Sequence, residues 1–399
     1  QTEVPKQVKG LPAVSNTYSL DFDGTDDIVN CGDTSNFITS AQARTVSLWT
    51  KLLNGSASND YYITLGNMTG TRTWFALRQN TDYLVFSDNT ADTNLNTTNA
   101  NMLDSWKHVA LTYDGSTTVK VYVDGSLDKS ITTGGTLATD QGADVIIGAR
   151  NSSDSADGTT VGQYINAKID EIGIFNTNLD ADSIRAIWNN GVPTNLKNNT
   201  GAYDEYTDNL VAYYRCGDGT LDEYPLIGDE VTPTLGSEMI GDGGFESGTD
   251  SWGNEDATLS SSADYANGGS KALKIVQSGT SYDLAYKSFT TVVGRTYKLD
   301  MWLYKHAESS GAVSWGIGES SSGAENVANT SMSTYTAWTQ IPSTTFVATV
   351  TTTYVHVIPY NGSTSSDTCY VDDVSVKLVN GNAGIMTNMA SEDIAEDTP

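Results

Sequence analysis

The chain has 399 residues, a length that suits two or three domains and is too great for one ordinary domain. It carries 49 acidic against 21 basic residues, and the net charge of −28 argues against nucleic-acid binding, because phosphates are held by basic faces. No stretch approaches the roughly 18 apolar residues of a membrane span, so no membrane insertion is expected.

Short β-branched and aromatic runs, separated by Gly, Ser, Thr, Asn and Asp, predict antiparallel strands from Tyr18 onward. Residues 1–15 hold two prolines and no alternation, and we interpret them as an N-terminal arm. The sequence opens at Gln1 rather than at Met. This indicates cleavage by a signal peptidase or a maturation protease, or a start upstream of the residues given.

The stretch WKHVALTYDGSTTVKVYVDGSL predicts a β-hairpin. Its apolar residues alternate on both sides of the Asp114–Gly115 turn, so Val109 and Leu111 are expected to share a face with Val119 and Val121.

In the stretch LDADSIRAIWNNG the period becomes helical, with Asp180 as the expected N-cap, Ile184 and Ile187 on one face and Gly191 as the C-cap. One short helix is therefore predicted to close the first domain.

This succession of elements predicts an antiparallel all-β protein with two β domains in tandem, and the short helix closes the first. The last residues are acidic and lack a strand pattern, and we expect them to be disordered or to extend over a neighbouring protein. The predicted parts are an N-terminal arm (1–15), a first sandwich (16–200), a connector with one strand-like run (201–237), a second sandwich (238–380) and an acidic C-terminal tail (381–399).

Six motifs follow one another with natural gaps between residues 16 and 191: YSLDFDGTDDIVNCG, RTVSLWTK, WKHVALTYDG, VKVYVDG, VIIGAR and KIDEIGIFNTNLDADSIRAIWNNG. Together they resemble the laminin-G-like, pentraxin-like branch of the concanavalin A-like jelly rolls. The resemblance implies a lectin-type sandwich for this part of the chain.

Five motifs between residues 238 and 379 resemble the family 4/9 and 22 carbohydrate-binding modules: GGFESGTDSW, GGSKALKI, SFTTVVGRTYKLDMWLYK, WTQIPSTTF and CYVDDVSVKLV. The two domains with the ending GIMTNMASEDIAEDTP are similar to virion structural proteins of tailed phages from marine settings. The resemblances imply that the fold is two antiparallel jelly-roll β-sandwich domains in tandem, and that the protein has a role on a virus particle.

The strand AKIDEIGIF places Asp170 beside Glu171. In a regular pleat their side chains point to opposite faces, so they cannot flank one glycosidic bond, which needs carboxyls about 5–10 Å apart. The E-x-D-x-x-E string of catalytic jelly-roll glucanases is absent, and the three histidines lie in no metal-binding or nucleophile context. The protein is therefore predicted not to be an enzyme.

The laminin-G-like resemblance implies that Asp170 binds a structural calcium ion together with Asp23 or nearby carbonyls of the FDG turn. The alternative is that Asp170 only caps neighbouring amides. In the second domain, the resemblance implies that Glu246 and Asp372 meet at another calcium ion. Calcium, as a structural ion, is the cofactor that we expect.

Sugars bind exposed aromatic rings by stacking, with hydrogen bonds from polar neighbours. Alternation in YKLDMWLYK places Trp302 and Tyr304 on the outward face of one strand, and His356 is expected alongside them. Trp74 with Arg78 is the counterpart in the first domain. The alternative is that a loop, a partner subunit or the other domain covers these aromatic residues.

The favoured hypothesis is a non-enzymatic virion structural protein, a capsid decoration protein or tail-associated appendage, whose lectin-like domains bind a polysaccharide or a host-surface glycan. Its expected partners are other virion proteins, its expected location is the extracellular virion surface, and it is expected to form a homo-oligomer, with a trimer as the first choice. The alternatives are a secreted or cell-surface bacterial carbohydrate-binding protein or adhesin, and an accessory region of a polysaccharide-degrading enzyme.

Overall fold

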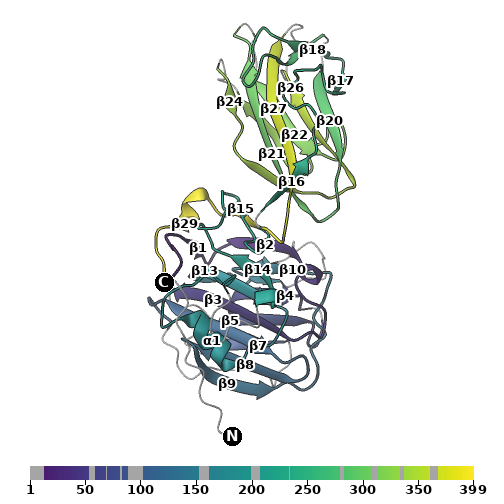
Figure 1. The fold of residues 1–399 in the computed structure, drawn as a ribbon. Helices are drawn as coiled ribbons and strands as arrows, with labels where there is room; N and C mark the ends of the chain where they lie inside the picture. The colour runs from purple at the N-terminus through teal and green to yellow at the C-terminus, as the bar shows by residue number, and fades with distance from the viewer. Residues whose placement is uncertain are drawn as a thin grey trace. The chain divides into compact units, whose positions relative to one another are not determined.

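The chain folds into two units, which we describe from a computed structural model (Figure 1). One unit holds Gln1–Thr234 together with Asn380–Pro399, and the other holds Leu235–Val379. Antiparallel sheets make up both units, so the predicted all-β fold of sandwich domains is confirmed. The structure describes residues 13–53, 59–68, 70–80, 83–88, 102–151, 161–198, 207–232, 234–278, 283–307, 309, 312–332, 337–359 and 367–399.

The first sheet of the first unit has the strand order β29-β1-β13-β3-β7-β8-β9, and β14 also pairs with β13. Its strands are β1 (Ser19–Asp23), β3 (Arg44–Leu52), β7 (Lys107–Tyr113), β8 (Thr118–Val123), β9 (Ser126–Thr132), β13 (Asn166–Phe175), β14 (Leu210–Tyr214) and β29 (Ile394–Ala395).

The second sheet of this unit has the order β15-β28-β2-β10-β4-β5-β6. Its strands are β2 (Ile28–Asp33), β4 (Asp60–Gly66), β5 (Trp74–Asn80), β6 (Tyr83–Ser87), β10 (Asp144–Ile147), β15 (Leu226–Ile227) and β28 (Gly384–Thr387). The short strands β11 (Arg150–Asn151) and β12 (Val161–Gly162) form a ribbon of their own, and 3-10 turns lie at Thr34–Asn36, Thr207–Asn209 and Ser391–Asp393.

The core of the first unit contains the inward residues of both sheets. In the β7–β8 hairpin, Val109 pairs with Val123 and Leu111 with Val121; Val109, Leu111 and Val121 join the core and the partly buried Val123 packs against it, as their alternation predicts. The turn is fixed by Asp114, whose carboxylate accepts hydrogen bonds from the amides of residues 116–118.

Helix α1 (Ala181–Trp188) forms where the helical period predicts it. The Asp180 side chain caps its N-terminus by accepting a hydrogen bond from the Ser183 amide, and Ile184 and Ile187 are buried. The C-cap is Asn189, in the left-handed conformation, two residues before the expected Gly191.

The prediction of a strandless C-terminal tail is wrong. Strand β28 lies between β15 and β2, and the two-residue β29 pairs with β1, so the segment after residue 380 completes both sheets of the first unit. Met386 and Met389 from this segment are buried in the core. The second unit is therefore inserted into the first along the chain, since the first unit contains both flanking segments.

The second unit is also a sandwich of two sheets. One has the order β18-β19-β27-β21-β24, with β16 beside β27 and β25 beside β21; the other has the order β17-β20-β26-β22-β23. The strands are β16 (Leu235–Glu238), β17 (Gly253–Glu255), β18 (Thr258–Ser262), β19 (Ala272–Val276), β20 (Leu284–Thr290), β21 (Thr296–Lys305), β22 (Val313–Gly318), β23 (Val327–Met332), β24 (Thr339–Gln340), β25 (Thr344–Val347), β26 (Thr352–Ile358) and β27 (Thr368–Val379).

Candidate functional site

The acid pair of β13 lies in a β-bulge. Glu171 has a left-handed backbone with φ 47°, and the pairing of β13 with β3 shifts between Asp170 and Gly173. As a result Ile169 and Ile172 both enter the core, so the alternation shifts by one residue. The prediction that the two acids point to opposite faces is wrong, because it assumed a regular pleat. Both side chains lie on the side away from the core.

Both carboxylates are buried, with 0% of Asp170 and 3% of Glu171 exposed, so a saccharide cannot reach them. Asp170 accepts hydrogen bonds from Asn16 Nδ2 at 2.8 Å and from the Glu171 amide at 2.7 Å. Glu171 accepts them from Arg215 Nε at 3.1 Å and from the Tyr213 hydroxyl. These bonds give the acids a structural role.

Burial raises the pKa of Asp170 well above its ordinary value, and the neighbouring charge of Glu171 adds to this effect. Burial also raises the pKa of Glu171, to about 7, although Arg215 and Tyr213 oppose the shift. Because Arg215 lies beside Glu171, the ionised form is favoured at Glu171 over Asp170.

The predicted calcium pair of Asp23 and Asp170 does not form. In the β1–β13 ladder Asp23 lies opposite Asn166, whereas Leu20 lies opposite Ile169, next to the acid pair. The two acids are therefore separated along the ladder.

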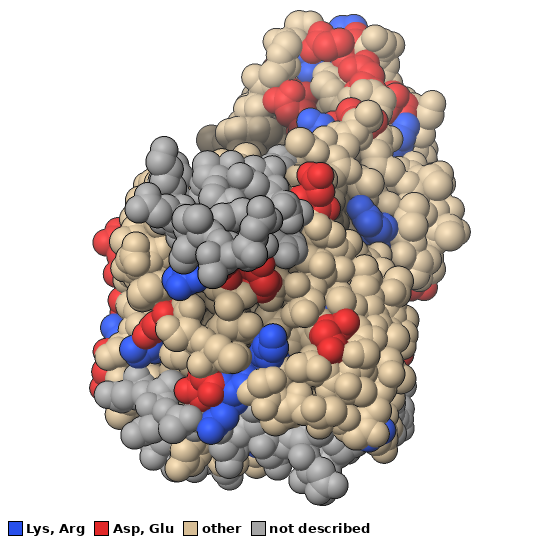
Figure 2. All heavy atoms as spheres, turned by 60° about the horizontal axis from the view of Figure 1, so that its bottom comes forward, with Lys and Arg blue, Asp and Glu red and all other residues tan. Residues whose placement is uncertain are grey.

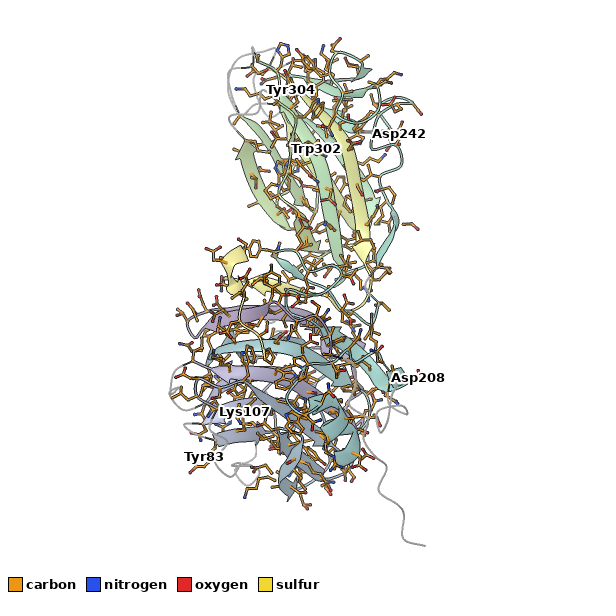
Figure 3. All side chains as sticks on the ribbon, turned by 60° about the vertical axis from the view of Figure 1, so that its left-hand side comes forward. Tyr83, Lys107, Asp208, Asp242, Trp302 and Tyr304 are labelled. Carbon is orange, nitrogen blue, oxygen red and sulfur yellow. The ribbon has the colours of Figure 1, made fainter. Side chains whose placement is uncertain are left out.

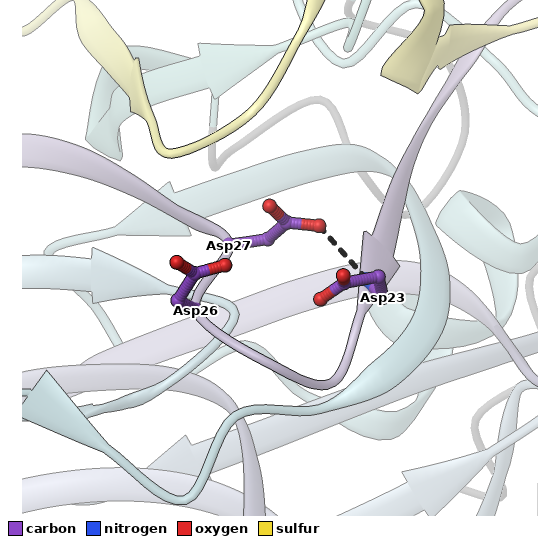
Figure 4. A group of neighbouring side chains, drawn as sticks. All are labelled: Asp23, Asp26 and Asp27. Atoms are coloured by element: carbon purple, nitrogen blue, oxygen red, sulfur yellow. Dashed lines mark hydrogen bonds between the residues drawn. The ribbon is translucent and has the colours of Figure 1, made fainter.

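Asp23 instead meets Asp26 and Asp27 at the turn after β1 (Figure 4). One carboxylate oxygen from each lies within 4.8 Å of the others, and Asp27 also accepts a hydrogen bond from the Asp23 amide at 2.9 Å. Burial raises the pKa of Asp27 to about 6, and the charges of Asp23 and Asp26 add to this. Oxygen ligands at this spacing suit calcium.

Glu246 and Asp372 both hold the loop between β18 and β19. Asp372 accepts hydrogen bonds from the amides of residues 267 and 268 at 2.7 and 3.1 Å. Glu246 accepts them from the amides of residues 270 and 271 at 2.7 and 3.0 Å. Both carboxylates therefore cap backbone amides of one loop. The calcium ion expected at Glu246 and Asp372 stays a prediction. Within the described ranges, the turn after β1 alone brings three metal-ligating side chains this close together.

Trp302 and Tyr304 project outward from β21, since Met301 and Leu303 enter the core on the other side (Figure 3). Trp302 is half-buried. Tyr304 is only 9% exposed because Tyr265, from the loop after β18, stacks on it with ring centroids 4.5 Å apart and planes 24° apart. A loop thus covers Tyr304, and the exposed aromatic ring at this place is Tyr265, which is 36% exposed.

Aromatic and charged side chains surround Tyr265. Tyr370 approaches it at 4.9 Å, and His306 meets it edge-on at 5.9 Å. Lys274 lies over the ring of Tyr370 and forms an ion pair of 2.8 Å with Asp264. We call Tyr265 and these four neighbours the Tyr265 cluster. It offers a flat apolar ring with hydrogen-bonding groups at its margin.

Sequence reasoning missed Tyr265. It lies in the stretch SSADYANGGS, whose composition indicates only a turn. The available signal was a single aromatic residue in an otherwise polar loop. Because a loop has no strand alternation, the sequence pattern could not predict that this residue packs on the sheet.

His356 does not lie alongside Trp302. It projects outward from β26, in the other sheet of the sandwich, and the core separates the two outward faces. His356 is fully buried, and its Nε2 lies 2.7 Å from the Asn329 Oδ1. The absent side chain of Gly316 leaves room for this contact. Burial lowers the pKa of His356 to about 4, so it is neutral at physiological pH.

Trp74 and Arg78 share one face of β5, but they form no exposed site. Trp74 is 1% and Arg78 7% exposed, and Trp74 packs on Tyr61 with ring centroids 5.3 Å apart. The predicted glycan-binding pair of the first unit is therefore wrong in position, because neighbouring side chains cover it.

The described residues contain no helix that is both long and apolar enough to cross a bilayer. The family model described as the concanavalin A-like lectin/glucanases superfamily matches residues 23–185. The first unit therefore contains a concanavalin A-like domain, and the laminin-G-like resemblance of this segment is confirmed. No curated protein sequence matches the chain.

Several solved structures are similar to parts of the chain. A presumed carbohydrate-binding protein from Bacteroides ovatus is 18% identical over 55% of this chain, with a TM-score of 0.40, and the chain covers 56% of it. The xylan-binding CBM22-1 domain from Paenibacillus barcinonensis is 11% identical over 37% of the chain and 96% of the domain, with a TM-score of 0.30. A heptameric pentraxin from Limulus polyphemus is 16% identical over 44% of the chain and 84% of its own length, with a TM-score of 0.33.

Proposed function

We propose that this is a non-enzymatic carbohydrate-binding protein whose second unit binds a glycan on the Tyr265 cluster. The observation that carries this proposal is the stacking of Tyr265 on Tyr304. One face of the Tyr265 ring is covered by Tyr304, and more than a third of the residue remains exposed. A sugar ring needs such a rigid, flat, apolar surface, with polar groups close by.

The neighbours of Tyr265 supply those polar groups. Asp264 and Lys274 are exposed or partly exposed, and His306 is half-buried at the edge of the ring. They offer both donors and acceptors for sugar hydroxyls. Tyr304 and Tyr370 lie opposite each other in adjacent strands, and both contact the ring of Tyr265, which holds it in place.

A glycan array of the full chain tests this proposal, with Tyr265→Ala and Trp302→Ala as variants. Tyr83, which is 41% exposed and lies in the first unit, gives the matched control Tyr83→Ala. Binding that is lost in Tyr265→Ala and kept in Tyr83→Ala supports the proposal. Equal binding by both variants contradicts it.

The burial of Asp170 and Glu171 supports a non-enzymatic role, because no acid pair of β13 can reach a glycosidic bond. The alternative, an accessory region of a polysaccharide-degrading enzyme, needs hydrolysis by another domain. Reducing-end assays of the purified chain on array-positive polysaccharides test the non-enzymatic role: release of sugar by this chain alone would contradict it.

For the biological setting we propose the virion surface, as a capsid decoration protein or tail-associated appendage that acts as a homo-oligomer, with a trimer as the first choice. The resemblance of the two domains and their ending to tailed-phage structural proteins supports this setting. A secreted or cell-surface bacterial carbohydrate-binding protein is the alternative. Mass spectrometry of purified particles, with light scattering of the isolated chain, distinguishes them.

A structural calcium ion at Asp23, Asp26 and Asp27 is also proposed. Three carboxylates within 4.8 Å repel one another, and the raised pKa of Asp27 reflects this in part. A bound calcium ion would remove that repulsion and link β1 to β2. Thermal unfolding in calcium, compared with magnesium and with chelator, tests the ion: we expect a higher Tm in calcium that Asp26→Asn abolishes. An unchanged Tm contradicts it.

A further inference from the structure

The C-terminal segment after β29 lies against a row of charged residues in the first unit. Asp21, Lys168 and Lys51 are opposite one another on the adjacent strands β1, β13 and β3. Their sequence neighbours Leu20 and Leu52 enter the core, so this row lies on the outward face. Lys168 forms an ion pair of 2.6 Å with Asp21.

Asp397 makes the remaining contacts to this row. Its Oδ2 lies 3.0 Å from Lys51 Nζ, and its Oδ1 accepts a hydrogen bond from Trp106 Nε1 at 3.1 Å. Its backbone oxygen accepts a hydrogen bond from Ser19 Oγ at 2.6 Å. Partial burial alone would raise the pKa of Asp397, but the bonds from Lys51 and Trp106 and the charge of Lys168 lower it. These contacts therefore favour the ionised carboxylate of Asp397.

Lys51 and Lys168 lie side by side on the outward face of adjacent strands, in a chain with 21 basic and 49 acidic residues. On the face shown in Figure 2, the described Lys and Arg side chains lie among Asp and Glu side chains. An anionic ligand that binds a lysine of this chain therefore competes with acidic side chains of the same chain. At Lys51 the competing side chain is Asp397.

The contacts that hold Asp397 are weak ones. The ion pair is partly exposed, with 23% of the Lys51 and 32% of the Asp397 side chain accessible, and such pairs are easily exchanged. Strand β29 contributes only two paired residues, whereas Met386 and Met389 anchor the segment further upstream.

We propose that Lys51, Lys168 and Trp106 form a subsite for the carboxylate of an acidic saccharide, a uronic acid, and that Asp397 occupies this subsite in cis. The proposal rests on the proposed carbohydrate-binding function. A uronate carboxylate would take the two donors that Asp397 uses, Lys51 Nζ and Trp106 Nε1. Lys168, which is ion-paired with Asp21, lies opposite Lys51 on the adjacent strand. The tail is then a competitor that sets the affinity for acidic glycans.

The test compares two tail variants of the full chain that remove the same charge. Asp397→Asn removes the charge by which the occupant binds Lys51, and Glu396→Gln removes the exposed acid beside it. The ligands are hexagalacturonate and its methyl-esterified form, which has the same rings without the charge. Calorimetry is expected to show about tenfold tighter hexagalacturonate binding for Asp397→Asn, because an intramolecular competitor is gone, and no change for Glu396→Gln.

The double variant Lys51→Met/Asp397→Asn is expected to lose this gain, and the esterified ligand is expected to show none. Equal affinities for Asp397→Asn and Glu396→Gln overturn the proposal, and so does an equal gain with the esterified ligand. Asp397→Ala replaces Asp397→Asn if circular dichroism shows that the latter is unfolded. The Tyr265→Ala variant distinguishes failure of this proposal from failure of the proposed function, because it leaves Lys51, Lys168 and Trp106 intact. Loss of neutral-glycan binding in this variant bears on the Tyr265 cluster of the second unit and not on the acidic subsite.

Discussion

The carboxylate of Asp170 accepts a hydrogen bond from the amide of the next residue, Glu171, at 2.7 Å, and the same relationship recurs in the second unit between Asp372 and Asp373 at 2.9 Å. In both places the second residue has a left-handed backbone, and the strand pairing shifts by one residue. The two sandwiches thus share an acid-stabilised bulge in β13 and β27. These acids stabilise the backbone, and no chemistry on a substrate is needed to explain them.

The two acids of β13 are expected to differ in their contributions to stability. Asp170→Asn keeps the shape of the side chain but replaces one of its two accepting oxygens by an NH2 group, and a loss of about 1 kcal/mol in the free energy of unfolding is expected. Glu171→Gln removes the charge beside Arg215, and a loss of about 2–4 kcal/mol is expected because a partly buried cation loses its partner. Urea unfolding of the full chain, followed by hydrogen exchange of β13, measures both. Equal losses would contradict the assignment of the charge to Glu171.

The raised pKa of Asp170 also predicts a pH dependence. The folded protein keeps a proton that the unfolded chain releases near the ordinary value of 3.8. The free energy of unfolding should therefore fall as the pH rises from 3.8 toward the raised pKa of the folded state. Asp170→Asn should remove this part of the slope. A slope that is unchanged in the variant would show that Asp170 is ionised in the folded protein.

The C-terminal segment is expected to stabilise the first unit. Met386 pairs with Val29 in the second sheet and is 4% exposed, so Met386→Ala should cost about 2–4 kcal/mol through the lost burial and the cavity left behind. Met239, partly buried in the second unit, provides the control Met239→Ala. Hydrogen exchange should show faster exchange in β2 and β15 only for Met386→Ala. Exchange that is unchanged in β2 would mean that the tail is dispensable for the first unit.

His356 should make the second unit sensitive to acid. Its pKa falls from an ordinary 6.5 to about 4 on burial, so the unfolded chain binds the proton first as the pH drops. Its contribution to stability is present above pH 6.5 and is lost between pH 6.5 and 4, up to about 3 kcal/mol.

The variant His356→Gln should flatten the acid slope of the second unit, while His306→Gln, at a half-buried position, serves as the control. Thermal unfolding between pH 4 and 7 gives both slopes. Parallel slopes for the two variants would rule out a neutral buried His356.

Alternation was enough to predict the regular parts of the fold. The β7–β8 hairpin, the faces of β21 and helix α1 follow directly from it, because each lies in a segment of unbroken period. The concanavalin A-like segment followed from six motifs in order.

Three features could not be predicted, each for a physical reason. The bulge at Glu171 depends on a left-handed residue that no pattern marks, and it places both acids on the same side of the sheet. Strand β28 has four residues and gains its stability from two neighbouring strands rather than from its own sequence. Tyr265 reaches Tyr304 through a loop, and loop residues carry no period.

The most direct test of the account is a calorimetric titration of one array-positive neutral oligosaccharide into the wild-type chain, Tyr265→Ala and Tyr83→Ala. Because a stacking contact contributes about 0.5–1.5 kcal/mol beyond the burial of its area, we predict that Tyr265→Ala binds about tenfold more weakly while Tyr83→Ala binds like the wild type. Wild-type affinity in Tyr265→Ala would contradict the assignment of the glycan site to the Tyr265 cluster.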